Sequence, residues 1–117
     1  ENVQHGIFAG NDCRIVNNLC CANGAGGTGS GIYVNEADTH IDGNTSNDND
    51  IGIEVTVGGC MIRRNVATGN TTYNWSIKAG NALAPIVNAS TNASDVNGNS
   101  TTGVSLGSTD PNANFTY

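Results

Sequence analysis

The sequence predicts an all-β solenoid, in which short strands wind into about four stacked coils. The main observation is a phrase, Ile-x-x-Asn-x4-Asn, that the chain contains three times. A second phrase, Gly-Ile-x-(Ala/Val), precedes each copy and begins at Gly6, Gly31 and Gly52, with a weaker copy at Ser76. Internal repeats of roughly 20 to 25 residues are typical of supersecondary units that stack to bury a shared core.

The composition agrees with a turn-rich β structure. The chain has 117 residues, which suit a single domain with a modest core. Its 19 Asn and 16 Gly residues are poor helix formers, so long helices are disfavoured. Only 12% of the residues are charged, and Ile and Val recur at fixed offsets, whereas disordered chains combine high charge with few β-branched residues.

The charge balance argues against several partners. The formal net charge is −6, and 4 Lys and Arg residues are too few to neutralise a row of phosphates, so we expect no nucleic-acid partner. We also expect no membrane insertion, because no apolar run approaches the length of a membrane span. An acidic polysaccharide would be repelled unless calcium or another cation bridged it to the chain.

Within each repeat, apolar residues alternate with others, which predicts strands with one buried face. The predicted inward residues are Ile7, Ile32, Ile53 and Ile77, then Ala9, Val34, Val55 and Ala79, and in a second strand Ile15, Ile41, Ile62 and Ile86. One outward column should hold Phe8, Tyr33, Glu54 and Lys78. The repeats are too short for a crossover helix, so successive coils should pair through parallel strands.

The repeated asparagines are predicted to form two ladders along the corners of the coils. The first ladder is Asn18, Asn44 and Asn65, and the second is Asn23, Asn49 and Asn70. Asn tolerates the left-handed backbone of a tight corner, and its amide both donates and accepts hydrogen bonds. Stacked amides can bond from one coil to the next, so we expect a structural role for these residues.

The pattern resembles the right-handed parallel β-helix repeat family, and residues 31–49 (GIYVNEADTHIDGNTSNDN) are the best match. The resemblance implies a short right-handed parallel β-helix over residues 1–87, then a loop and an irregular C-terminal cap over residues 88–117. In that cap Val104, Leu106, Phe115 and Tyr117 should cover the last coil, with Trp75 packed there rather than serving as a sugar platform. The family includes polysaccharide lyases, hydrolases and epimerases, phage tailspikes and uncharacterised secreted bacterial proteins, so the fold leaves the activity open.

The four cysteines, Cys13, Cys20, Cys21 and Cys60, follow no metal-binding spacing. Small buried thiols are the favoured interpretation, and a disulfide from Cys13 to Cys20 or Cys21 is the alternative. Cys13 and Cys60 share a predicted column but lie two coils apart, about 9 to 10 Å, which exceeds the reach of a disulfide.

Acidic residues cluster in the second repeat and leave three interpretations open. A solvated turn surface is favoured, because Asp is common in turns. Calcium binding by Asp38, Asp42 and Asp48 is a weaker alternative, and no other cofactor is expected. Glycan cleavage by Asp38 and Asp42 with Arg63 and His40 is the third. An ordinary ion pair between Asp42 and Arg63 on adjacent coils is preferred to a catalytic role.

The outward column is the candidate contact surface. Glu54 and Lys78 should form an ion pair between adjacent coils. Phe8 and Tyr33 expose two rings together in a chain with 5% aromatic residues, which favours an interface. Contact between subunits is preferred to a bound sugar or to cover by an upstream segment. The small core and the lack of a cap before Gly6 also favour a homo-oligomer, with a trimer preferred.

The sequence therefore favours a non-catalytic, secreted or cell-surface module for assembly or recognition, with a polysaccharide as one candidate ligand. We interpret it as the C-terminal part of a longer bacterial or phage protein. The alternatives are a fragment of a polysaccharide lyase, hydrolase or epimerase that acts on an extracellular glycan, and a segment of a phage-tail or adhesin fibre.

Overall fold

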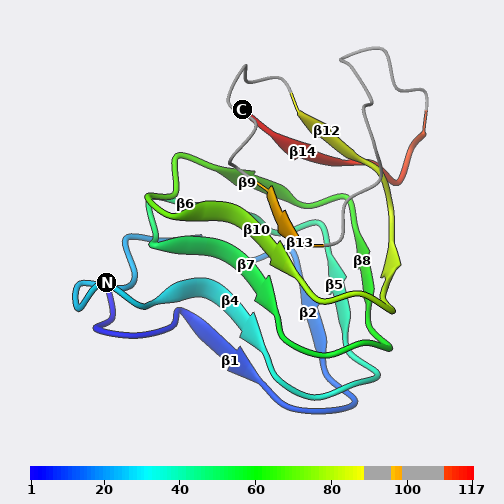
Figure 1. Ribbon diagram of the computed structural model, residues 1–117, viewed down its shortest axis with the longest axis horizontal. Coiled ribbons are helices and arrows are strands. Elements are labelled where there is room, and N and C mark those ends of the chain that lie inside the picture. The colour runs from blue at the N-terminus through cyan, green and yellow to red at the C-terminus, as the bar shows by residue number, and fades with distance from the viewer. Residues whose placement is uncertain (89–95, 99–109) are drawn as a thin grey trace.

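The chain folds into stacked coils of β-strand, as the repeats predicted. The computed structural model describes residues 1–88, 96–98 and 110–117, and these form strands and turns without a helix. Each coil adds one strand to each of three parallel sheets, and about four coils stack into a β-solenoid (Figure 1). The predicted all-β, parallel-stranded solenoid is therefore confirmed. No helix in the described part of the chain is long and apolar enough to cross a membrane.

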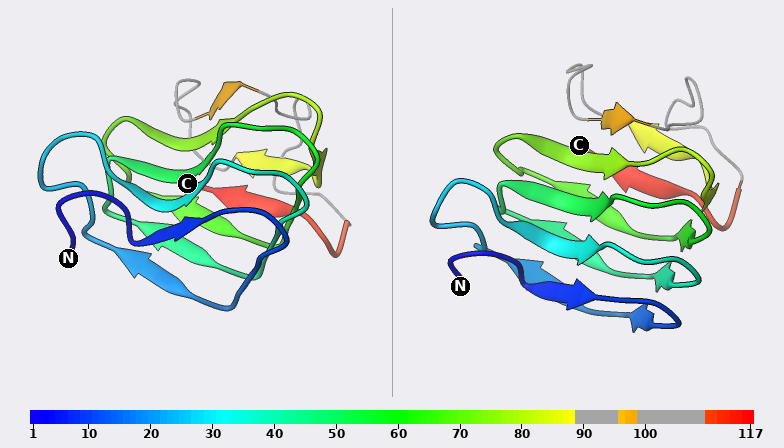
Figure 2. Two further views of the ribbon diagram at one scale, coloured as in Figure 1. Left: turned by 90° about the horizontal axis from the view of Figure 1, so that it is seen from below. Right: turned by 60° about the horizontal axis from the view of Figure 1, so that its bottom comes forward.

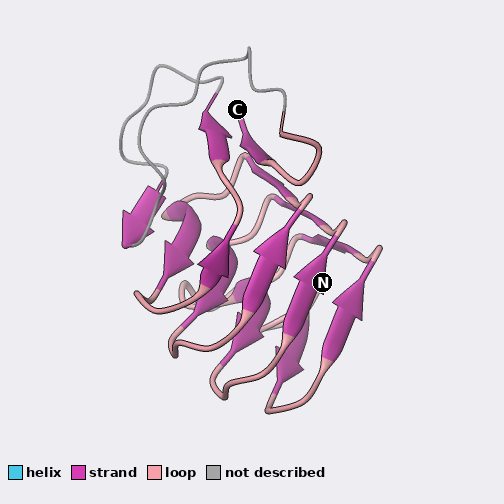
Figure 3. Cartoon of the chain, turned by 90° about the vertical axis from the view of Figure 1, so that its right-hand side faces the viewer, coloured by secondary structure: helices cyan, strands magenta, loops and turns pink. Residues whose placement is uncertain are grey.

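The three sheets run side by side along the stack (Figures 2 and 3). Sheet A holds β1 (Ile7–Ala9), β4 (Ser30–Val34), β7 (Ile51–Val55), β10 (Tyr73–Ile77) and β13 (Val96–Gly98). Sheet B holds β2 (Arg14–Val16), β5 (His40–Asp42), β8 (Met61–Arg63) and β11 (Ala82–Leu83). Sheet C holds β3 (Leu19–Cys21), β6 (Thr45–Asn47), β9 (Val66–Thr68), β14 (Asn114–Thr116) and β12 (Ile86–Asn88).

Inward side chains of successive coils lie above one another and form the core. Ile32 pairs in register with Ile53 in sheet A. In sheet B, Ile41 pairs with both Ile15 and Ile62. Ile32, Ile41, Ile53 and Ile62 expose no surface. Because equivalent side chains occupy equivalent places in each coil, the repeated phrase specifies a continuous apolar interior.

Each corner of a coil turns on one residue with left-handed backbone. The three corner columns are Asp12, Asp38, Gly59 and Gly80, then Asn17, Gly43 and Arg64, then Ala22, Asp48 and Gly69, with φ between 55° and 93°. None of the six predicted ladder asparagines has this conformation, and each directly follows a residue that does. The prediction that the ladder asparagines themselves turn the corner is wrong. The bend falls one residue earlier, which leaves the asparagine backbone ordinary and its amide free to bond along the stack.

The fourth coil follows a different alignment from the predicted one. Trp75, and not Ile77, pairs with Ile53, while Ile77 pairs with Val55. Trp75 is fully buried, so its indole fills the core column that isoleucine fills below, and it presents no platform for a sugar. The predicted inward position of Ala79 is wrong, because Ala79 is exposed.

The same correction applies to the second strand of that coil. Leu83 pairs with Ile62 in sheet B, whereas Ile86 lies in sheet C opposite Asn114. Matching isoleucine to isoleucine misplaced this coil, because the core column requires an apolar side chain of fitting volume and not one residue type.

The end of the chain enters the solenoid instead of only covering it. β14 lies between β9 and β12 in sheet C, and Figure 1 shows it in red beside β12. Asn114 and Thr116 are fully buried, whereas Phe115 is 39% exposed and Tyr117 is 66% exposed. The prediction that Phe115 and Tyr117 cover the last coil is therefore wrong, since they alternate with the buried residues and face outward. The other predicted cap residues, Val104 and Leu106, lie outside the described residues.

Candidate functional site

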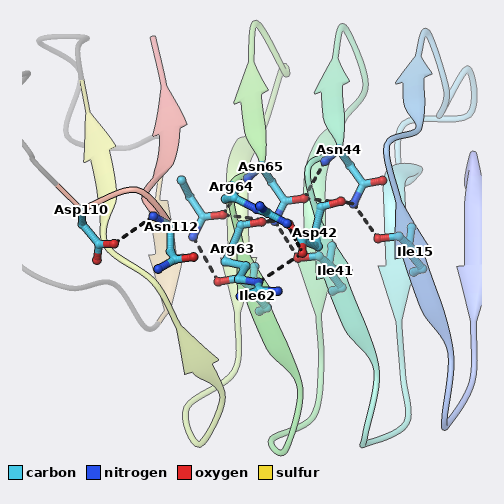
Figure 4. A network of polar contacts seen from close by, with 11 residues as sticks. Ile15, Ile41, Asp42, Asn44, Ile62, Arg63, Arg64, Asn65, Asp110 and Asn112 are labelled. Carbon is cyan, nitrogen blue, oxygen red and sulfur yellow. Dashed lines mark hydrogen bonds and ion pairs between the residues drawn. The ribbon is translucent and has the colours of Figure 1, made fainter.

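A first ladder of side-chain amides runs along the corner between sheets B and C. Nδ2 of Asn18 donates to Oδ1 of Asn44 at 3.0 Å, and the same bond joins Asn44 to Asn65 at 3.0 Å and Asn65 to Asn114 at 3.1 Å. Each of these Oδ1 atoms also accepts the backbone N–H of the asparagine one step earlier, at 2.9 or 3.0 Å. Figure 4 shows Asn44 and Asn65 in this arrangement. All the amides point the same way, so each coil is bonded to the next.

A second ladder lies at the corner between sheets C and A. It holds the predicted residues Asn23, Asn49 and Asn70, which bond in series at 2.9 and 3.1 Å. Asn2 donates to the first of them at 2.8 Å, and Asn70 donates to Asn74 at 2.8 Å. Both ladders thus extend beyond the repeated phrase, to residues that the sequence pattern did not mark.

The outer side of sheet A carries three aromatic rings in contact. We call His5, Phe8 and Tyr33 the aromatic face. Phe8 and Tyr33 pair in register, with ring centroids 5.3 Å apart and ring planes 28° apart. His5 stacks on Tyr33 with centroids 4.4 Å apart and planes at 17°. Phe8 is 62% exposed and Tyr33 is half-buried, so Phe8 presents most of the open ring surface.

Hydrogen bonds from Ser30 to His5 and to Glu54 support the aromatic face. Ser30 Oγ donates to Glu54 Oε2 at 2.5 Å, and the Ser30 backbone N–H donates to His5 Nδ1 at 3.0 Å. Ser30 is fully buried, so its hydroxyl is not accessible to a substrate and acts as a support. These bonds hold the His5 ring and the Glu54 carboxylate in place beside Tyr33, which gives the face a fixed geometry.

The outward column continues differently from the prediction. Tyr33 pairs with Glu54 as expected, but Glu54 pairs next with Ser76 and not with Lys78. The predicted ion pair between Glu54 and Lys78 is therefore wrong. The cause is the shifted alignment of the fourth coil, which places exposed Lys78 beyond the end of β10.

Asp42 is the candidate residue that pairs with two arginines, Arg63 and Arg64 (Figure 4). Arg63 Nε donates to its Oδ2 at 3.1 Å, while Arg64 donates through Nε to Oδ1 at 2.7 Å and through Nη2 to Oδ2 at 2.6 Å. Asp42 is only 4% exposed. Hydrogen bonds from the Arg64 guanidinium, with its charge and that of Arg63, lower the pKa of Asp42 against the opposing effect of burial. Asp42 and Arg63 thus meet on adjacent coils, as the ion-pair interpretation predicted.

Replacing Asp42 with asparagine is expected to lower the free energy of unfolding at neutral pH by about 1 kcal/mol, since both arginines are partly solvated. Because the folded-state pKa of Asp42 is lowered, its contribution is present above the unfolded value of about 3.9 and is lost as pH falls through the folded pKa. Urea unfolding from pH 7 to pH 2 would measure the effect. The two proteins should converge in stability at the acid end.

The matched control is Asp38→Asn. Asp38 is exposed at a left-handed corner, where asparagine is tolerated equally well. We expect this change to leave the stability at neutral pH within about 0.5 kcal/mol of the wild type. An Asp42→Asn protein with the pH profile of the wild type would contradict the role given to the pair.

The remaining acidic candidates and His40 do not converge on Asp42. Asp38 and Asp48 occupy left-handed positions at two different corners, both exposed, whereas Asp42 ends β5 in sheet B. His40 is exposed at the start of the same strand. Among the described residues, no group of three or more His, Cys, Asp or Glu residues is placed to hold a metal ion. Corner geometry accounts for the acidic residues at 38 and 48.

All four cysteines are free thiols, so the alternative disulfide from Cys13 is not formed. Cys20 and Cys60 are buried, as the small-thiol interpretation predicted, and burial raises the pKa of the Cys20 thiol, with a smaller contribution from Cys21. For Cys21 the small-thiol interpretation is wrong, because Cys21 follows inward-facing Cys20 in β3 and therefore points outward, where it is exposed. Cys13 is only partly buried.

Sequence reasoning did not place three residues in these surfaces. His5 and Ser30 precede the repeated phrases, so no column located them beside Tyr33. Arg64 stands in a corner column with Asn17 and Gly43, and its left-handed backbone (φ 56°) accompanies the contact with Asp42. Comparing the residues just before each ladder asparagine would have identified that column and the unusual arginine in it.

No family model, curated protein or solved structure matches this chain.

Proposed function

We propose that this chain is a non-catalytic recognition and assembly module whose contact surface is the aromatic face on sheet A. The observation that carries the proposal is the stack of His5, Tyr33 and Phe8, held in place by the hydrogen bonds of Ser30. A rigid aromatic group loses little conformational freedom when it binds, which is why such groups are enriched at the centres of interfaces.

The arrangement of the other candidates agrees with a non-catalytic role. Both carboxylate oxygens of Asp42 accept hydrogen bonds from arginines, so this group is not free to abstract a proton or to attack a sugar. Glycoside hydrolysis typically uses two carboxylates that face one bond, and Asp38 stands at the corner before β5 whereas Asp42 ends that strand. An enzyme fragment is thus the less favoured alternative.

Assembly is the first form of the proposal. We expect a homo-oligomer, with a trimer preferred, on the outside of a bacterial cell or in a phage fibre, as the resemblance to parallel β-helices implies. Phe8, 62% exposed, would be covered by a neighbouring copy. Burying such a ring contributes on the order of 2 kcal/mol per copy.

The test is the solution mass of the chain by light scattering. Wild type is expected to be oligomeric, and Phe8→Ala and Tyr33→Ala should shift it toward the monomer. Leu19→Ala is the matched control, because Leu19 is 69% exposed but lies in sheet C, away from the aromatic face. Equal shifts from Phe8→Ala and Leu19→Ala, or a monomeric wild type, would contradict assembly through this face.

A bound polysaccharide is the second candidate ligand. It is favoured by the position of the Glu54 carboxylate in the same outward column as the Tyr33 and Phe8 rings, since sugars combine stacking with hydrogen bonds. Calorimetric titration with a neutral glucan oligosaccharide, and with an oligogalacturonate in the presence and absence of calcium, would test it. Binding that survives Tyr33→Ala would place any sugar elsewhere.

A further inference from the structure

Sheet C contains a strand that the winding of the chain does not supply in order. In the other two sheets each coil lays its strand on the strand of the preceding coil, as β10 lies on β7 and β11 on β8. In sheet C the fourth-coil strand β12 does not pair with β9, because β14 from the end of the chain lies between them (Figure 1). β9 and β12 therefore form the two walls of a slot that is one strand wide.

The backbone of β14 is bonded to both walls. On the third-coil side, the Phe115 N–H donates to the Asn65 carbonyl at 2.8 Å. On the fourth-coil side, the Asn114 N–H donates to the Pro85 carbonyl at 2.7 Å. Three residues of β14 pair in register with β12. A strand in this slot thus gains main-chain hydrogen bonds on each edge, which is the basis of strand-addition binding.

The two walls of the slot recognise an asparagine through main-chain groups and one side-chain amide. The backbone N–H and Nδ2 of Asn65 both donate to Oδ1 of Asn114, at 3.0 and 3.1 Å. Nδ2 of Asn114 donates to the carbonyls of Ile62 at 3.2 Å and Ala84 at 3.0 Å. Asn114 has no exposed surface, so a strand without this amide would leave buried groups of both walls without partners.

A hydroxyl two positions further along is recognised as well. Nδ2 of Asn74, at the end of the second ladder, donates to Oγ1 of fully buried Thr116 at 2.7 Å. One short segment of pattern Asn-x-Thr, when it lies in the slot, therefore completes both ladders. All of these partners belong to the third and fourth coils, and none of the bonds depends on the covalent link between the strand and the same chain.

We infer that the slot between β9 and β12 is a strand-binding site, and that the C-terminal strand of a second copy occupies it in a reciprocally exchanged dimer. A second copy carries the required asparagine and threonine at the required spacing, and it offers an identical slot in return, so the exchange closes with two-fold symmetry. The inference goes beyond the assembly proposed above, because it uses sheet C and not the aromatic face, so either can fail alone.

Exchange and self-insertion make the same bonds, so concentration decides between them. A tethered strand competes at an effective concentration on the order of millimolar, and exchange is therefore favoured in concentrated protein and reversed slowly on dilution. Free peptide of the same sequence should compete with both forms, because the slot recognises the strand and not the tether.

The first experiment uses the full chain carrying Asn114→Ala, whose own strand no longer completes the ladder. A fluorescently labelled peptide of residues 110–117 (DPNANFTY) is titrated into it, and anisotropy is measured. We expect saturation at one peptide per chain, and binding at least about tenfold weaker for a peptide that carries the same Asn→Ala change. Equal binding of the two peptides, or no binding to a folded chain, would overturn the strand-binding site.

Folding of the variant is checked by circular dichroism and by the emission of buried Trp75. If Asn114→Ala does not fold, Thr116→Val takes its place, because it removes only the acceptor for Asn74. The labelled peptide should then bind the Thr116→Val chain, and a peptide with the same Thr→Val change should bind more weakly. The opposite ranking would count against the site in the same way.

The second experiment tests whether the occupant is another copy. Full chains with Cys13→Ser and Phe8→Ala, of which the second change removes assembly through the aromatic face, are labelled at exposed Cys21 with a donor or an acceptor fluorophore, mixed at high concentration and then diluted. We expect energy transfer that excess peptide 110–117 abolishes. Transfer that the peptide does not abolish would show association by another route and overturn exchange. No transfer would overturn the second copy as the occupant.

Discussion

A chain carrying Gly31→Ala is expected to lose its cooperative fold, with the free energy of unfolding lowered by about 4 kcal/mol or more. A Cβ at this position would lie 2.0 Å from Ser46 Oγ, 2.7 Å from Asn49 Nδ2 and 2.9 Å from the Gly52 carbonyl. Ser46 and Asn49 are themselves bonded to each other at 3.1 Å at the ladder corner, so neither can withdraw without breaking that corner. Urea unfolding monitored by Trp75 fluorescence would measure the loss.

Gly10→Ala is the matched control, at a glycine that follows the first strand of its coil. The nearest atom to a Cβ there is Glu36 Oε2 at 3.5 Å, an ordinary contact with a flexible side chain. Gly10 has no positive φ, so alanine should be neutral or should stabilise by about 0.5 kcal/mol through the unfolded state. If Gly31→Ala unfolded at the same urea concentration as Gly10→Ala, the close packing of the corner against β4 would be refuted.

Asn65→Ala is the second change with a large expected effect, a loss of about 3 kcal/mol or more. Oδ1 of Asn65 accepts two hydrogen bonds from Asn44, and its Nδ2 donates to the carbonyls of Ile41 and Arg63 and to Asn114. The residue is fully buried, so water cannot replace these partners. Thermal unfolding followed by circular dichroism would show a lower midpoint.

Asn47→Ala provides the comparison in the same repeat. Within the described part of the chain the Asn47 side chain donates only to the exposed Asp48 carboxylate, so its loss should change stability by no more than about 0.5 kcal/mol. Asn65→Asp separates the two halves of the amide, because it keeps the acceptor and replaces the donor. Burial should raise the pKa of the introduced carboxyl, so this variant should become more stable relative to wild type as pH falls. Asn65→Ala should show no such recovery.

The parts of the fold that were predictable are those in which one residue's environment repeats. Ile15, Ile32 and Ile41 each meet an isoleucine in the next coil, so the period of the sequence gives their position directly. The ladder amides are predictable for the same reason. Where the repeat degenerates this reasoning fails, and Trp75 takes a column that had been assigned to Ile77.

Of the candidate site, the sequence predicted only which residues share an outward column. Phe8, Tyr33 and Glu54 share one outward column because strand pairing in register places them there. The stacking of His5 on Tyr33 was not predictable, since His5 precedes the first strand and belongs to no repeated column. Its ring is held beside Tyr33 by a hydrogen bond from the backbone of Ser30, which is distant from His5 in the sequence. Arg64 was missed because left-handed backbone is a property of the corner and not of arginine.

By itself the sequence determined the stacking of the coils, the inner apolar columns of the first three coils and the repeated amides of the two ladders, because these follow from identical residues meeting at a fixed period. Only the tertiary structure decided how the stack ends. Asn114 lies far from Asn65 along the chain, in a segment with no repeat, and no local pattern encodes that it completes the ladder. The fourth-coil strand β12 does not pair with β9, so the edge of β9 and the buried Asn65 amide both need a partner. Asn114 and its strand β14 supply that partner.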